Sequence, residues 1–465
     1  MPVSVRPRAW AVAFFLCGAL MRLALCWSNP PTNAFDDHYE PILMIMRTGV
    51  IPAKDACWEC YHPPVFYWLS AMIGNFAVRM GVHPRHLLKL LQFIPCVYGI
   101  LNMGMIYLIL RKVPLSDFPR LAAFGTVCFL PRHIYMSAMH SNDTISYLCV
   151  SLCIYLLLIA IERTLSPASL VAVTVALTIA LFTKYTAYAM LPVTLIAFAA
   201  LFIGPGPSSR ARVLGSCILV FLLPLAALGV SLAANARHYG RPMPINLDLR
   251  GVRLAQPRDA NRFDFVSFTP WDSIAMPILV PGKMHSFWTM LYRGMWYDTE
   301  PKFLYFLDSN AGWWNHYYAW LRGEKDFPGD NPSMSSLTRC MGGSLIILGL
   351  LPLLLLGGGA WIYCRGGWRR WSSAPEVDAA KMSVFPALLL STTSGIIALA
   401  WRYPYYSAVK ASYVLAAAPA YAVFLGLGLM PCEIHEEAKR IIARIFAITW
   451  GLSALHILHI ILSIS

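Results

Sequence analysis

The stretch FDDHYE (residues 35–40) follows an apolar run at residues 9–27 and places two adjacent carboxylates, Asp36 and Asp37, at its edge. Because carboxylates beside hydrocarbon are costly, we expect these two acids to serve chemistry. Of the 465 residues, 58% are hydrophobic and 13% are charged, whereas an ordinary soluble domain has about 25% charged residues. The sequence therefore predicts an all-α polytopic membrane protein with Asp36 and Asp37 at the mouth of its first span.

About eleven apolar runs approach the length of roughly 20 residues that a membrane helix needs. They lie at residues 9–27, 88–110, 120–139, 144–162, 166–183, 186–203, 211–235, 338–362, 383–401, 411–430 and 443–463. No convincing small-x-small cleavage site follows the first run, which we therefore expect to be an uncleaved span rather than a signal peptide. A further run at 63–80 contains Arg79. We expect it to lie in the outer interface as a half-buried helix that does not cross.

The net charge of +14 comes largely from basic residues in short loops between the apolar runs, which is the pattern of orientation signals. If 63–80 does not cross, all these loops face the cytoplasm. They contain Arg6, Arg8, Arg111, Lys112, Arg120, Arg163, Arg210, Arg212, Arg365, Arg369, Arg370, Lys381, Lys439 and Arg440. This topology places the N-terminus inside and the C-terminus outside. It favours a membrane-lipid or lipid-phosphate partner over nucleic acid.

The pattern divides the chain into three parts. Residues 1–235 form an N-terminal transmembrane catalytic module with an external loop at 28–87. Residues 236–337 are polar and rich in aromatic side chains, and we expect a large external loop or small insert there. Residues 338–465 form a C-terminal transmembrane module.

Several polar side chains meet on the external side in this topology. Asp143 lies in the stretch MHSNDTISY between the third and fourth spans, and Lys184 lies between the fifth and sixth. The others are His62, Arg85 and Lys89 near the second span, and Arg402, Tyr405 and Lys410 in the stretch WRYPYYSAVKASY. Carboxylates and cations from distant segments thus converge, as an active site at a membrane–water boundary requires.

Cys57, Cys60 and His62 are spaced like metal ligands. A structural zinc site normally needs four ligands, and only three are present here. In an oxidising compartment the two cysteines could instead form a disulfide, and free thiols are the remaining alternative.

The order of these motifs resembles a known family. An acidic pair after the first span, then HPPVFYWLSA (62–71), an aspartate before the fourth span, and LFTKYT (181–186) are together similar to the C-type glycosyltransferases. Protein O-mannosyltransferases and the lipid A aminoarabinose transferase are the most similar members. The resemblance covers residues 10–235 and is weaker over 383–430. It implies a C-type glycosyltransferase fold and transfer of a sugar from a polyprenyl-phosphate carrier to an acceptor outside the cytoplasm.

The resemblance also implies roles for individual residues. Asp37, or else Asp36, matches the general base, since a hydroxyl needs a carboxylate to take its proton. Asp143 matches a second acid, although the turn here reads HSND. The candidate ligands of the departing phosphate, whose negative charge needs cations, are Lys184, Lys410, Arg402, and Arg85 or Lys89. His62 and Tyr405 are further substrate-binding candidates. No cofactor is expected, and a divalent metal is left open.

Simpler interpretations exist for each residue. Asp36, Asp37 and Asp143 could cap helices, Lys184 could only extend its charge to the interface, and His62 could belong to a proline-led helix start. A transporter of a lipid-linked substrate or a non-catalytic protein of the same fold is the alternative function. The near absence of Glu, Asp and Lys from the middles of the apolar runs favours the enzyme. The sugar, the acceptor (protein, lipid A or glycan) and the compartment (periplasmic side of a bacterial inner membrane, or endoplasmic-reticulum lumen) stay open.

Overall fold

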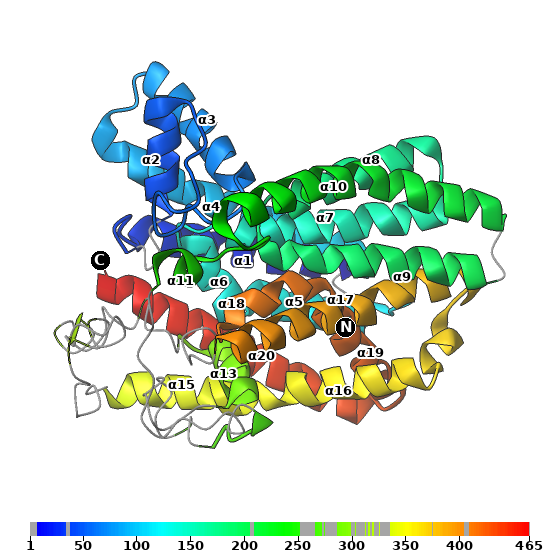
Figure 1. Cartoon of the computed structure of the whole chain (residues 1–465). Coiled ribbons are helices and arrows are strands. Elements are labelled where there is room, and N and C mark those ends of the chain that lie inside the picture. Colours follow the sequence, from blue (N-terminus) through cyan, green and yellow to red (C-terminus); the bar gives the residue numbers. More distant parts are fainter. Residues whose placement is uncertain are drawn as a thin grey trace.

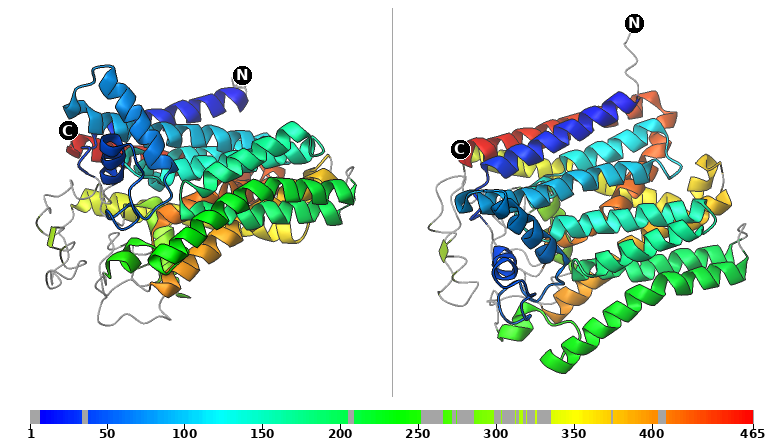
Figure 2. Two further views of the ribbon diagram at one scale, coloured as in Figure 1. Left: turned by 45° about the horizontal axis from the view of Figure 1, so that its top comes forward. Right: turned by 90° about the horizontal axis from the view of Figure 1, so that it is seen from above.

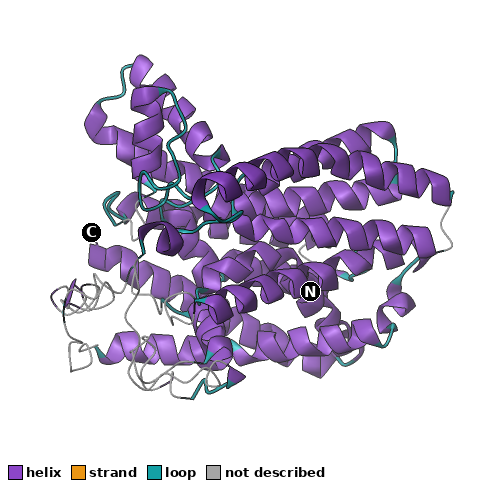
Figure 3. Cartoon of the chain, viewed as in Figure 1, coloured by secondary structure: helices purple, strands orange, loops and turns teal. Residues whose placement is uncertain are grey.

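The computed structural model describes most of the chain, and every regular element in the described part is a helix (Figure 3). The described residues are 7–33, 38–204, 209–251, 266–271, 274, 286–298, 303, 312, 315–316, 319, 325, 335–373, 375–403 and 409–464. Asp36, Asp37 and Tyr405 lie outside them.

The helices follow the apolar runs of the sequence. They are α1 (Pro7–Ser28), α2 (Tyr39–Thr48), α3 (Val65–Arg79), α4 (Pro84–Leu110), α5 (Asp117–Phe129), α6 (Pro131–Ala138), α7 (Asp143–Glu162), α8 (Pro167–Leu181), η1 (Tyr185–Ala189), α9 (Met190–Ile203), α10 (Arg210–Tyr239), α11 (Asn246–Arg250), α13 (Phe287–Trp296), α15 (Ser336–Leu348), α16 (Leu350–Cys364), η4 (Gly367–Trp371), α17 (Pro375–Arg402), α18 (Ala411–Val414), η6 (Leu415–Ala417), α19 (Ala418–Leu429), η7 (Met430–Ile434) and α20 (Glu436–Ile464).

Nine helical segments in the described part of the chain are long and apolar enough to cross a membrane. The predicted polytopic all-α fold is therefore confirmed, whereas the count of eleven is not. The two predicted spans outside the nine are 120–139 and 166–183. The first divides into α5 and α6, because Leu130 precedes Pro131 and is held extended, at φ −65° and ψ 115°, as proline imposes on the residue before it. The second forms α8, which has only 15 residues.

The long helices run side by side, and α2 and α3 project from one end of the bundle, near the C-terminus (Figure 1). We call this the first-loop end. Helix α1 begins toward the opposite end (Figure 2), which also carries the turns between α7 and α8 and between α16 and α17. Helix α3, with 15 residues, is not among the nine candidate spans.

A salt-bridge network at the opposite end agrees with this topology. Lys112 Nζ lies 2.7 Å from Glu162 Oε2, and Lys381 Nζ lies 3.3 Å from Glu162 Oε1. The loop after α4 therefore lies beside the turn after α7 and the start of α17. This placement fits the version in which residues 63–80 do not cross.

A second polar network lies inside the bundle. The Arg22 guanidinium donates to the carbonyl oxygens of Gly18 and Cys128, both at 2.8 Å, and contacts His133 Nδ1 at 2.7 Å. His133 Nε2 in turn lies 2.9 Å from Asn102 Nδ2. Because a buried charge is tolerated only when hydrogen-bonded, this network fixes α1 against α4, α5 and α6.

Glycines set the closest helix contact. A Cβ atom added at Gly359 of α16 would overlap the carbonyl oxygen of Phe424 in α19, and one at Gly428 would overlap that of Leu355. Small residues let two backbones approach in this way. The C-terminal helices therefore pack backbone to backbone.

The described part of residues 236–337 is not separate from the bundle. Phe287, Met290 and Leu291 of α13 are buried in one apolar cluster with residues of α1, α6, α17 and α20. Helix α13 thus anchors this part of the chain in the core at the first-loop end.

Candidate functional site

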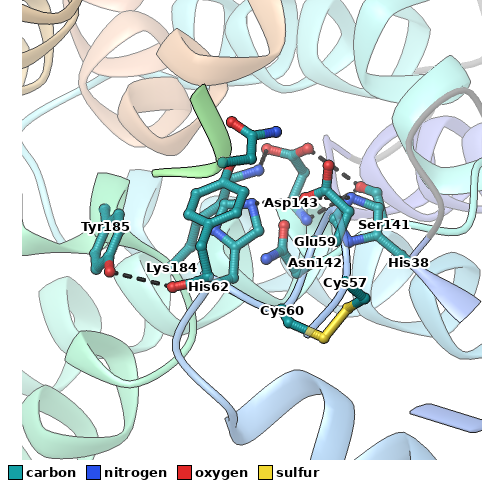
Figure 4. A network of polar contacts seen from close by, with 12 residues as sticks. His38, Cys57, Glu59, Cys60, His62, Ser141, Asn142, Asp143, Lys184 and Tyr185 are labelled. Atoms are coloured by element: carbon teal, nitrogen blue, oxygen red, sulfur yellow. Dashed lines mark hydrogen bonds and ion pairs between the residues drawn. A yellow bond between two sulfur atoms is a disulfide. The ribbon is translucent and has the colours of Figure 1, made fainter. Parts of the chain in front are cut away.

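A buried ion pair lies at the first-loop end of the bundle. Lys184 Nζ lies 2.7 Å from Asp143 Oδ1, and the two side chains are only 6% and 8% exposed. Asp143 is the first residue of α7, and Lys184 immediately precedes η1. Two segments that the sequence analysis proposed for the site are therefore in direct contact (Figure 4).

Asp143 does not cap its own helix. The N-cap of α7 is Asn142, and its side chain makes no capping hydrogen bond. The hydroxyl of Ser141 donates to Asp143 Oδ2 at 3.2 Å and accepts from the Asp143 amide at 3.1 Å. Ser141 thus contacts one oxygen of the Asp143 carboxylate and Lys184 contacts the other.

The first external loop contributes a second network beside this pair (Figure 4). Glu59 Oε2 lies 3.1 Å from His62 Nε2 and 4.0 Å from His38 Nε2. His38 Nδ1 lies 2.9 Å from the hydroxyl of Tyr67, which donates to the backbone carbonyl of Glu59 at 3.2 Å. The side-chain amide of Asn142 donates from Nδ2 to the same Tyr67 hydroxyl at 3.5 Å, so the network reaches the start of α7.

A disulfide joins Cys57 and Cys60 and encloses Glu59 in its short loop. The disulfide alternative is confirmed, and a zinc site on these two sulfur atoms is wrong because both are used in the bond. Among the residues the structure describes, no group of three or more His, Cys, Asp or Glu side chains is arranged to hold a metal ion.

Burial changes the pKa values of side chains in the first loop and in the turn between α6 and α7. His140 stacks on Tyr39 at a ring distance of 3.7 Å. Burial, together with the nearby His38, holds the pKa of His140 well below its usual value, so His140 is neutral at physiological pH. Burial also lowers the pKa of Lys54 to about 8. The Lys54 ammonium donates to the backbone carbonyl of Tyr61 at 2.6 Å.

The segment that contains Lys410 lies next to the ion pair. Lys184 Nζ sits 5.5 Å from the ring centre of Tyr413, and the Tyr147 hydroxyl donates to the backbone carbonyl of Ser412 at 2.6 Å. Ser412 and Tyr413 belong to the short helix α18, and Lys410 is its N-cap residue. The structure therefore brings together the segments of Asp143, Lys184 and Lys410.

The other predicted cations have their own contacts. Lys89 donates to the carbonyl oxygens of Cys26 (2.6 Å) and Asn29 (2.7 Å) at the end of α1. Arg85 is exposed, and its Nε donates to His86 Nε2 at 3.0 Å. Arg402 Nη2 lies 3.3 Å from Asp248 Oδ2 of α11, a carboxylate that also pairs with Arg241. Each of these three cations thus contacts a partner other than Asp143 and Lys184, and their role as phosphate ligands stays a prediction.

The proposed base lies outside the described residues, but its chain neighbours belong to the network. His38 and Tyr39, which directly follow Asp37, are both buried. Asp37 is bonded directly to His38 in the chain, and consecutive Cα atoms are about 3.8 Å apart. The acidic pair is therefore joined to the His38 side of the network.

Comparison with known proteins gives a family model and a set of solved structures. A family model described as dolichyl-phosphate-mannose-protein mannosyltransferase matches residues 61–230. The Archaeoglobus fulgidus oligosaccharyltransferase, in a complex with an inhibitory peptide and a dolichol-phosphate, aligns with a TM-score of 0.54 and 13% identity over 97% of this chain. The predicted resemblance to the C-type glycosyltransferases is confirmed.

The structural match extends over nearly all of this chain but not over its neighbour. The same archaeal enzyme, in complex with zinc and sulfate, aligns with a TM-score of 0.51 and 12% identity over 96% of this chain and 53% of its own. The chain thus spans just over half the length of that enzyme. ArnT from Cupriavidus metallidurans is 16% identical over 90% of this chain and 76% of its own, with a TM-score of 0.37. The search of curated proteins found no match.

The sequence analysis did not select several residues of the network. Glu59, His38, Tyr67 and Ser141 contact each other or the predicted site residues, yet they lie in loops or on a helix of ordinary composition. The signal that could have pointed to Glu59 was its position between two cysteines, since a closed disulfide loop holds its enclosed side chain in place.

Proposed function

We propose that this chain is an integral-membrane glycosyltransferase that moves a sugar from a polyprenyl-phosphate carrier to a hydroxyl acceptor at the first-loop end of the bundle. The observation that carries the proposal is the buried Asp143–Lys184 pair, which lies beside the first loop in a bundle with the fold of a C-type glycosyltransferase. A buried cation at the ends of apolar helices is suited to a lipid phosphate that approaches from the bilayer.

The chemistry follows from the residue types. The acceptor oxygen forms a bond to the anomeric carbon as the bond from that carbon to the phosphate oxygen breaks, with inversion at the carbon. Asp37, or else Asp36, takes the proton of the acceptor hydroxyl. The leaving phosphate keeps the bonding electrons, and Lys184 and Lys410 stabilise its charge.

Asp143 positions Lys184 in this scheme. An ammonium group has three donors, and one of them is directed at the Asp143 carboxylate at 2.7 Å. Two donors remain for a phosphate. Because the cation is held before the substrate binds, little reorganisation is needed as the charge on the leaving group develops.

The donor and acceptor classes rest on the comparisons. The family model refers to a dolichyl-phosphate sugar donor, and the archaeal enzyme has been solved with a dolichol-phosphate and with an acceptor peptide. A polyprenyl-phosphate hexose or pentose is therefore our proposed donor, and a protein, lipid A or another glycan the acceptor. We place the site on the periplasmic side of a bacterial inner membrane, with the endoplasmic-reticulum lumen as the alternative.

The test uses cells from which the gene has been deleted and into which the wild-type gene or one variant has been reintroduced. The masses of glycolipids and glycoproteins are compared between these cells. We expect Asp37→Asn to insert normally and to lose the transferred sugar mass, since a positioned base contributes about 100- to 10,000-fold to the rate. Asp55→Asn is the matched control, because Asp55 is exposed in the same loop. Full transfer by Asp36→Asn, Asp37→Asn and the double variant would refute the base assignment.

A further inference from the structure

A pocket with a volume of about 520 Å³ lies at the end of the bundle opposite the first loop. Three parts of the chain form it: the end of α4 with the following loop, the end of α7, and a third part with Ser373, Asp378 and Lys381, the last two in α17. Its charged lining residues are Arg111, Lys112, Glu162, Asp378 and Lys381. None of them belongs to the candidate site at the first-loop end.

The charges of the lining do not balance. Lys112 and Lys381 both pair with Glu162, and Lys381 also pairs with Asp378 at 2.6 Å. Two lysines and two carboxylates therefore neutralise each other. The Arg111 guanidinium forms no hydrogen bond or ion pair with any residue in the described ranges, so the pocket retains one surplus positive charge.

The pocket also has apolar lining residues, with Val113 and Pro114 in the loop after α4 and Leu108 within the helix. Arg111 and Ser373 lie at its outer part, where helices end, and Leu108 lies one turn before Arg111 on α4. Tyr155 lies seven residues before Glu162 on α7, which is about 10 Å deeper at 1.5 Å per residue. The lining therefore offers charged groups where the helices end and apolar surface beside and below them, which suits a molecule with one charged and one apolar part.

The neighbouring segment has the composition of a membrane–water interface. The sequence RGGWRRW (365–371) joins α16 to α17 just before Ser373. The Arg365 guanidinium lies 4.5 Å from the ring centre of Trp361, and that of Arg369 lies 5.8 Å from the ring centre of Trp368. Tryptophan and cationic side chains gather at the membrane–water interface.

We propose that this pocket binds the headgroup of an anionic phospholipid from the leaflet at this end, with Arg111 as the main ligand of its phosphodiester. One phosphodiester carries one negative charge and matches the surplus of the lining. Arginine binds phosphate oxygens through two parallel donors, and basic pockets between membrane helices recognise lipid headgroups. The apolar inner part, at Leu108 and Tyr155, receives the start of an acyl chain.

The experiment measures binding by the full-length protein in detergent micelles mixed with phosphatidylglycerol or phosphatidylcholine at equal mole fractions. Thermal stability and lipid retained in native mass spectra report on binding independently of any transferase activity. We expect phosphatidylglycerol to be retained and to raise the unfolding temperature. Arg111→Glu should weaken the affinity for phosphatidylglycerol by about tenfold or more, which is the scale of a lost charge-assisted hydrogen bond. Arg111→Lys should weaken this affinity less.

Arg163→Glu is the matched control. Arg163 is exposed at the same end, next to Glu162, and does not line the pocket. Equal effects of Arg163→Glu and Arg111→Glu would show that only general surface charge matters and would overturn the proposal. Equal retention of phosphatidylcholine would overturn the preference for an anionic headgroup. If soluble glycerol 3-phosphate stabilised the protein as strongly as phosphatidylglycerol, the ligand would be a free phosphate ester and the lipid assignment would be wrong.

Discussion

Replacing Lys184 by methionine tests whether the buried ion pair serves chemistry or only structure. The substitution keeps an unbranched apolar stem and removes the charge. It leaves the Asp143 carboxylate, which is 8% exposed, without its cation. Asp143→Asn removes the carboxylate charge and leaves the Lys184 ammonium without its anion. The double variant removes both charges and keeps the approximate side-chain volumes.

The size of the effect follows from the geometry. Two unit charges 2.7 Å apart attract each other by about 6 kcal/mol at an effective dielectric constant of roughly 20. The loss of solvation on burial offsets part of this attraction. Removing one partner of a buried pair typically costs about 3–5 kcal/mol, and we expect this loss of unfolding free energy in each single variant. The double variant should be close to wild type, because no unpaired charge remains.

Two assays on the same proteins separate the explanations. Chemical unfolding in detergent gives the stability of each variant, and the mass of the transferred sugar gives its activity. If Lys184 binds the leaving phosphate, the double variant regains stability but transfers sugar at least about 100-fold more slowly, as for the loss of one donor to a developing oxyanion. Recovery of both stability and transfer in the double variant would refute the phosphate role and leave Lys184 as a counterion.

Three further predictions concern stability and the first loop. Gly359→Ala should lower the unfolding free energy by about 1–3 kcal/mol through overpacking. Gly358→Ala is the control, because an added Cβ there meets nothing within 4 Å. Equal melting temperatures of the two variants would contradict this prediction. Burial lowers the pKa of Lys54 from 10.5 to about 8, so between these values the native state binds fewer protons than the unfolded chain. The unfolding free energy should therefore rise with pH there, and a rise of the same slope in Lys54→Met would disprove this origin. Peptide mapping of unreduced protein should find Cys57 bonded to Cys60; alkylation of both without prior reduction would contradict the structure.

Much of the fold could be predicted from hydropathy, because the bilayer imposes a minimum length on each apolar run. The first-loop helix was predictable too, since moving the basic loop at 111–120 outside would have broken the charge pattern. The division at Pro131 was missed although its cause is local. Hydropathy alone shows one continuous apolar run there, and the extended backbone that Pro131 imposes on Leu130 does not change it.

The site was predictable only in part. Asp143 and Lys184 lie at the ends of apolar runs on the same side, so their meeting follows from topology. Lys89 instead caps the end of α1, because the last carbonyl groups of a helix attract a nearby cation and the pairing of α1 with α4 is a tertiary feature. The contacts of Glu59 with His38 and His62 likewise depend on how the first loop closes, which no periodicity encodes.

The position of Arg22 has a consequence for biogenesis. Its partners Cys128 and His133 come 106 and 111 residues later in the chain, so the first span leaves the ribosome long before they exist. A lone arginine costs about 2.5–3.5 kcal/mol during insertion at the centre of a membrane helix, and less toward its ends; Arg22 lies six residues before the end of α1. We therefore expect α1 to stay at the translocon, or to sit displaced toward the headgroups, until α5 and α6 have been synthesised and draw it into place.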